Sequence, residues 1–139
     1  MIAAKKAKSP YLFEAERDQP LTERAIAEIE RNRGIRFPEA FIAHLATEGA
    51  GDFAYGSIYS PDSESTWSLW NEYQYFPDML GQIVPFSDNG GGDYYCFPVV
   101  DGQCQDRVFW ADHEQDYQVI ESDCADFREF VAKICLEPA

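Results

Sequence analysis

Apolar positions in the first third of the chain recur at helical spacing and predict two short helices. The first begins at Thr22, whose hydroxyl can accept a hydrogen bond from a free amide of the first turn, and it ends at Gly34. The second takes Pro38 as its first helical residue and ends at Gly49. The two helices are expected to form a hairpin.

Farther along the chain, the apolar spacing changes from that of helices to that of strands. Residues 66–76 are rich in aromatic side chains and have an ambiguous pattern, which fits a strand followed by a short helix. A third helix is predicted to open near Ser122 or Asp123. Short connections rich in Gly, Asp and Asn favour antiparallel pairing of the predicted strands, which cover residues 53–59, 83–86, 94–100, 107–110 and 117–120.

This order of elements predicts an α+β fold. It has two N-terminal helices, a mainly antiparallel sheet of about five to six strands, and a C-terminal helix. Residues 1–20 show no sustained period and are expected to form an irregular N-terminal lead-in. The remaining residues, 21–139, have the length of a single domain.

Charge is distributed unevenly along the chain. The net charge is −14; residues 1–36 hold eight basic and six acidic side chains, whereas residues 37–139 hold three and 19. Nucleic acid and anionic membranes are negatively charged, like residues 37–139, and are therefore not expected as partners. A basic protein partner is favoured instead, although acidity can also serve solubility alone.

The first residues and the cysteines indicate the cellular compartment that is expected for the protein. Residues 1–10 carry three Lys without an apolar run behind them, so no export signal is predicted and a cytoplasmic location is expected. The four cysteines lack Cys-x-x-Cys spacing and are expected to be reduced, mostly buried thiols, with a bridge between Cys96 and Cys104 as the less favoured alternative.

The run Gly90, Gly91, Gly92, Asp93 lies between two predicted strands. Three glycines permit positive φ angles, so the run is interpreted as a structural turn. A phosphate cradle is disfavoured because Asp93 and a strand follow where a helix would be needed. Oxygen ligands for calcium could come from Asp88, Asn89 and Asp93, but the spacing of an EF-hand loop is absent.

Three pieces of the sequence resemble the SUKH superfamily, which includes bacterial toxin-immunity proteins and relatives of a fungal cell-wall assembly regulator. The first piece is Gly-Ile-Arg-Phe-Pro-Glu at 34–39 with the apolar helix after it. The second is Ile-Val-Pro-Phe at 83–86 leading into the glycine run. The third is Val-Phe-Trp-Ala-Asp-His-Glu at 108–114 with the final helix. The chain departs from the pattern at 48–51 and in its aromatic insert at 66–76.

The resemblance implies a single domain that acts by binding, without catalytic residues or a cofactor. It suggests an immunity-type protein that neutralises a basic toxin domain; a regulatory or scaffold module that recruits an endogenous protein is the alternative. The candidate partner-binding residues are acidic or aromatic side chains of three segments, namely Asp62, Glu64, Trp70, Glu72, Tyr75, Asp112, Glu114 and Asp116. The sequence does not indicate the oligomeric state.

An enzyme is the remaining hypothesis, and it depends on two histidines. His113 is flanked by carboxylates and could titrate near neutrality, which suits a general base or a metal ligand. Neighbouring residues of a turn rarely converge on one ion, and His44 is expected to have a packing or surface role on its helix. We therefore expect no metal site, no cofactor and no catalytic activity.

Overall fold

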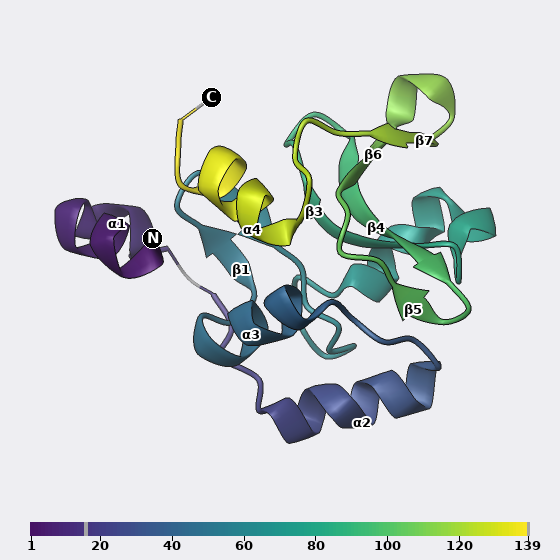
Figure 1. The fold of residues 1–139 in the computed structure, drawn as a ribbon, viewed down its shortest axis with the longest axis horizontal. Helices are drawn as coiled ribbons and strands as arrows, with labels where there is room; N and C mark the ends of the chain where they lie inside the picture. Colours follow the sequence, from purple (N-terminus) through teal and green to yellow (C-terminus); the bar gives the residue numbers. More distant parts are fainter. Residues whose placement is uncertain (16, 139) are drawn as a thin grey trace.

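A five-stranded antiparallel sheet forms the centre of the computed structural model, which describes residues 1–15 and 17–138 (Figure 1). Four strands lie in the order β3-β4-β6-β7, and β5 pairs with the far end of β4. The strands are β3 (Ile83–Asp88), β4 (Tyr94–Val100), β5 (Gln103–Cys104), β6 (Phe109–Asp112) and β7 (Gln118–Glu121). The predicted α+β class and antiparallel pairing are confirmed.

The two predicted N-terminal helices are present with the expected boundary signals. Helix α2 (Glu23–Arg33) begins after Thr22, whose hydroxyl accepts from the Ala25 N–H at 3.1 Å, and it ends at Gly34 with φ of 66°. Helix α3 (Glu39–Thr47) starts one residue later than expected, because Pro38 has an extended backbone and precedes the first helical residue.

The C-terminal helix begins later than predicted. Helix α4 (Phe127–Phe130) opens at Asp126, whose carboxylate accepts from the Glu129 N–H at 2.9 Å, and a π-helical turn (Val131–Cys135) continues it. Ser122 does not cap it. Its hydroxyl instead donates to the Val108 carbonyl at 2.7 Å, which holds the loop after β7 against the sheet.

Three further differences concern the short elements. Residues 53–59 are not one strand: they belong to a hairpin of β1 (Gly51–Phe53) and β2 (Gly56–Ile58), which turns at Ala54 with φ of 54°. In the ambiguous 66–76 stretch the expected short helix is present, as a 3-10 helix at Leu69–Tyr75, but the strand expected before it is reduced to an isolated bridge between Ser60 and Ser68. The segment expected to be irregular contains helix α1 (Ile2–Lys8) and a 3-10 turn, Pro10–Phe13.

The sheet is covered on both faces. On one face Phe97 of β4 packs with Phe41 of α3 and Phe127 of α4, at ring-centroid distances of 5.4 and 6.0 Å. On the other face Tyr94 packs against Phe76, next to the Leu69–Tyr75 helix, at 5.0 Å. Because successive side chains of a strand point to opposite faces, the aromatic run of β4 supplies both layers.

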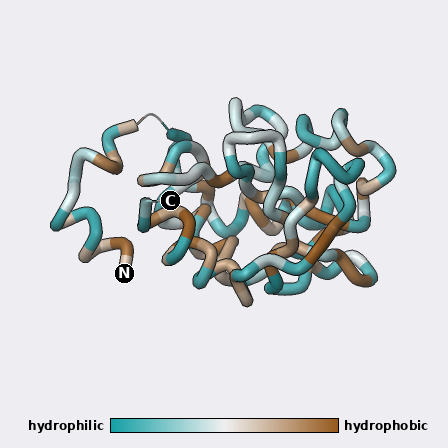
Figure 2. The backbone as a smooth tube through the Cα atoms, turned by 90° about the horizontal axis from the view of Figure 1, so that it is seen from above, coloured by the Kyte–Doolittle hydropathy of each residue, from teal (hydrophilic) through white to brown (hydrophobic). Residues whose placement is uncertain are grey.

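Helix α1 lies at one end of the molecule (Figures 1 and 2), and its residues line a shallow pocket together with Leu136 and Glu137. Lys6 of α1 joins this segment to the domain through Glu48, with Nζ 2.6 Å from the carboxylate. Within the described part of the chain, no helix is long and apolar enough to span a bilayer.

All four cysteines are buried free thiols, which confirms the prediction from their spacing. Cys104 is paired in register with Val99, so it does not lie opposite Cys96 and the alternative bridge is not formed. Burial raises the pKa of Cys96 and Cys104 to about 12, and this keeps the thiols protonated and unreactive.

Candidate partner-binding surface

The β3–β4 connection is a hydrogen-bonded turn built on its acidic and amide side chains. The Asn89 side-chain oxygen accepts from the N–H groups of Gly91 and Asp93, at 2.8 and 3.1 Å. Gly90 and Gly92 have positive φ angles of 77° and 104°, a conformation that other residues rarely adopt. These contacts give the run the geometry of a tight, self-bonded turn.

Asp93 fastens this turn to the loop between β6 and β7. It is 7% exposed, and its carboxylate accepts from the His113 N–H at 2.9 Å, contacts His113 Nδ1 and accepts from the Asn89 amide at 3.0 Å. Burial alone would raise the pKa of Asp93, but these bonds from His113 lower it below its usual value. The same hydrogen bond raises the pKa of His113.

Asp93, Asp112 and His113 also bring three possible metal-ligating atoms within 4.8 Å of one another. Both Asp93 oxygens already accept hydrogen bonds from protein groups, and Asp112 accepts from the Glu114 N–H at 3.0 Å. The group therefore serves as the fastening between two turns. Asp88 and Asn89, which could supply calcium ligands, likewise use side-chain oxygens within the protein. These oxygens accept hydrogen bonds from the N–H groups of Gly90 and Gly91 in the same turn.

Glu72 connects the Leu69–Tyr75 helix to the sheet. Its carboxylate accepts from the Tyr94 hydroxyl at 3.0 Å, and Tyr59 donates to Asp88 nearby. Partial burial raises the pKa of Glu72, and the negative charge of Asp88 raises it further. The hydrogen bond from Tyr94 acts in the opposite direction but does not cancel this increase in the pKa. Negative charge is thus concentrated between this helix and the glycine turn.

Tyr117 joins the same helix to the 112–116 turn. Its ring lies 5.0 Å from Phe76 and 6.1 Å from Tyr94, and it directly follows Asp116. Tyr59, which donates to Asp88, packs on Tyr94 in turn, so aromatic contacts connect the three acidic segments. We call their carboxylates the acidic surface, defined as Glu72, Asp88, Asp112, Glu114 and Asp116.

Trp70 and Tyr75, the two aromatic candidates, differ in exposure. The guanidinium of Arg33 covers the Trp70 ring at 4.0 Å from its centroid, and the indole N–H donates to the Pro61 carbonyl at 2.6 Å. Tyr75 is 54% exposed and remains available for contact. Of the two, Tyr75 has the geometry of a free anchor.

Asp62 and Glu64 lie on a separate loop. The Asp62 carboxylate accepts from the Glu64 N–H at 3.0 Å, and Ser65 donates to Asp18 of the N-terminal segment. The loop reaches the Leu69–Tyr75 helix through Pro61 and Trp70, on the side that faces Arg33. The contacts that hold this loop thus run to Asp18 and, through Trp70, to Arg33 of α2.

His44 occupies a packing position. It is 5% exposed and lies edge-on to Phe53 and Phe127, at centroid distances of 4.8 and 5.7 Å. Burial lowers the pKa of His44 to about 4, so the imidazole is neutral at physiological pH. Of the two roles expected for His44, packing and surface, the structure shows packing.

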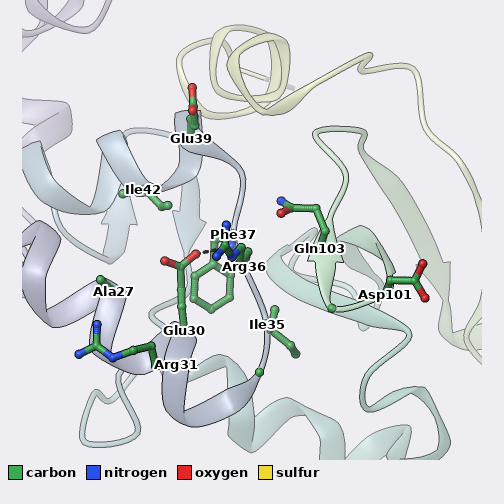
Figure 3. Close-up of a pocket in the computed structure, with 12 residues that line it drawn as sticks. Ala27, Glu30, Arg31, Ile35, Arg36, Phe37, Glu39, Ile42, Asp101 and Gln103 are labelled. Atoms are coloured by element: carbon green, nitrogen blue, oxygen red, sulfur yellow. Dashed lines mark hydrogen bonds between the residues drawn. The ribbon is translucent and has the colours of Figure 1, made fainter.

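Sequence reasoning missed a groove of about 890 Å³ between α2 and the β4–β5 turn (Figure 3). Arg36 donates its N–H to the Gly102 carbonyl at 2.7 Å, which brings the two segments together, and the Glu30 carboxylate accepts from the Phe37 N–H at 2.8 Å. Its charged lining mixes both signs, as it comprises Glu30, Arg31, Arg36, Glu39 and Asp101. No local motif could have revealed it, because the lining residues come from distant parts of the chain.

Comparison with curated proteins finds no match for this chain. A protein-family model, described as SMI1 / KNR4 family (SUKH-1), matches residues 20–133. The match covers most of the chain, including α2, α3, the whole sheet, α4 and the first part of the π-helical turn. The chain therefore belongs to the SMI1/KNR4 (SUKH-1) family.

Proposed function

We propose that this protein is an immunity-type protein, which binds a basic toxin domain in the cytoplasm of the producing cell and neutralises it without catalysis. Membership of SUKH-1, a family of immunity-type proteins, supports the class of function. The charge of the chain supports the chemistry of the partner, because a net charge of −14 suits a basic domain such as a nuclease.

The observation that carries the proposal is the connected set of carboxylates in the acidic surface. Glu72 is tied to Tyr94, and Tyr117 packs on Tyr94, so the helix and the 112–116 turn are held in one arrangement before any partner arrives. Prearranged negative charge attracts a basic partner over a distance and loses little conformational entropy on binding.

The mechanism that follows is steering and occlusion. Long-range attraction raises the association rate, and the bound protein then covers the positively charged cleft with which a nuclease-type toxin holds its substrate. Tyr75, exposed beside Glu72, provides an aromatic contact of the kind enriched at the centres of interfaces. No bond is made or broken in this mechanism.

Co-expression with a toxin domain encoded next to this gene tests the proposal. We expect a 1:1 complex on gel filtration and complete inhibition of the toxin at one equivalent. Inhibition by far less than one equivalent would indicate catalysis and contradict the proposal. Failure to bind any adjacent toxin, together with a stable complex with a host protein, would favour the scaffold alternative.

A further inference from the structure

Strand β7 is the last strand of the sheet, and its outer edge is open. It pairs with β6 on one side only. Across residues 1–15 and 17–138, no bridge or further backbone hydrogen bond reaches the outer side of residues 118–121. Figure 1 shows β7 at the margin of the fold, beyond β6. Such an edge presents unpaired N–H and C=O groups that can bind an added strand.

The register identifies the backbone groups that face outward. Ser122 donates its N–H to the Val108 carbonyl at 3.2 Å, which makes this a hydrogen-bonded pair that continues the β6–β7 ladder. Hydrogen-bonded and non-hydrogen-bonded pairs alternate in antiparallel sheets. The N–H and C=O groups of Val119 and Glu121 therefore point away from β6, toward the open edge.

The surface beside this edge carries large apolar side chains in register. Tyr95 pairs with Trp110, and Trp110 pairs with Ile120, so the three lie side by side across β4, β6 and β7. The Tyr95 and Trp110 rings are stacked at 6.3 Å, and Ile120 is 46% exposed. Ile120, at the outer end of this row, would be the direct cross-strand neighbour of a side chain on an added strand.

Acidic residues surround both ends of β7. Asp112 at the end of β6 and Glu114 and Asp116 in the turn precede it, and Glu121 and Asp123 lie at its end. Arg107 is the cation paired with Glu121, at 2.5 Å. This excess of negative charge would repel an acidic strand and attract a basic one.

We propose that the open edge of β7 binds an extended, basic segment of the toxin domain, which adds to the sheet as a further strand. Main-chain hydrogen bonds to Val119 and Glu121 supply the pairing, Ile120 supplies an apolar contact, and the flanking carboxylates select for Lys and Arg. The inference rests on the proposed function for the identity of the partner, but the edge itself can be tested without that partner.

The test without the partner uses a (Lys-Val)₄ peptide and, as a control of equal charge that cannot pair as a strand, a (Lys-Pro)₄ peptide. We expect saturable binding of (Lys-Val)₄ with slowed amide hydrogen exchange at Val119 and Glu121, measured by NMR, and no such protection from (Lys-Pro)₄. Equal effects of the two peptides, or protection elsewhere only, would overturn the edge inference even if the toxin complex forms.

The test with the partner compares two variants at one exposed position. Glu121→Gln removes the charge and the ion pair with Arg107, whereas Glu121→Pro also removes the outward N–H. We expect Glu121→Pro to weaken toxin binding at least about tenfold more than Glu121→Gln, with both variants folded by circular dichroism. Equal affinities of two folded variants would contradict strand addition, whereas absence of any toxin complex would contradict the proposed function.

Discussion

The Tyr94 hydroxyl donates a hydrogen bond to Glu72 at 3.0 Å and so joins the central strand of the sheet to the aromatic helix Leu69–Tyr75. The bond holds an ionisable carboxylate in a partly buried place, next to the charge of Asp88, and the pKa of Glu72 is raised as a result. A carboxylate held in this way contributes to a prearranged acidic surface at some cost in its own solvation.

Replacement of Tyr94 by Phe should destabilise the protein by about 1 kcal/mol, because Glu72 loses its donor while the packing of the ring on Phe76 is kept. The free energy of unfolding in urea measures this. Tyr75→Phe is the matched control, since Tyr75 is 54% exposed, and it should change stability by less than about 0.5 kcal/mol. Equal effects of the two substitutions would show that the Tyr94 bond does not hold the helix in place.

The second prediction is that substitutions at Gly91 and Gly92 of the glycine run differ in their effect on stability. Gly92 has φ of 104°, and an added Cβ would lie 3.1 Å from His113 Nδ1, so Gly92→Ala should cost about 1–3 kcal/mol and loosen the Asp93–His113 fastening. Gly91 has no such angle, and its nearest neighbour would lie 3.5 Å away. Gly91→Ala should therefore be nearly neutral. Thermal unfolding of both variants checks the difference, and similar melting temperatures would contradict a structural role for the turn.

The burial of neutral His44 should make the protein less stable in acid. Its pKa is lowered by burial from 6.5 to about 4, so between these values the unfolded chain binds a proton that the folded chain does not. Stability is then lost as pH falls, by about 1.4 kcal/mol per pH unit and about 3 kcal/mol in total. His44→Phe should remove this component from urea unfolding measured at pH 6.5 and 4.5. An unchanged difference between the two pH values would show that His44 is not buried as described.

Elements with local signals could be predicted from sequence. Thr22 and Gly34 determine the ends of α2 through a side-chain cap and a positive φ, both of which depend on neighbouring residues alone. Strand β4 was predicted with its observed bounds, Tyr94–Val100, because the glycine turn and the turn at Asp101 delimit it.

Elements set by tertiary contacts were predicted less well. The turn between β1 and β2 places Ala54 at positive φ, which Ala does not favour, and the Tyr55 N–H donates to the distant Cys135 carbonyl at 2.8 Å. Likewise, no pattern near Trp70 could show that Arg33 of α2 covers its ring. The candidate acidic residues were identifiable in the sequence by their charge. The hydrogen bonds that hold their loops, from Ser65 to Asp18 and from His113 to Asp93, join distant parts of the chain and have no local signal.

Electrostatic steering by the acidic surface predicts an effect that depends on position as well as on charge. Glu114→Lys with Asp116→Asn changes the charge of the surface by three units, and Asn tolerates the positive φ of 54° at position 116. Glu28→Lys with Glu23→Gln makes the same change on the exposed side of α2 and serves as the control.

The most direct test of the central claim is the association rate constant with the toxin domain, measured by stopped flow at several salt concentrations for both double variants and the wild type. We expect the Glu114/Asp116 variant to associate about tenfold more slowly at low salt, with a weaker salt dependence, and the Glu28/Glu23 variant to stay within about twofold of the wild type. Equal slowing of the two variants, or no slowing in either, would contradict binding through the acidic surface.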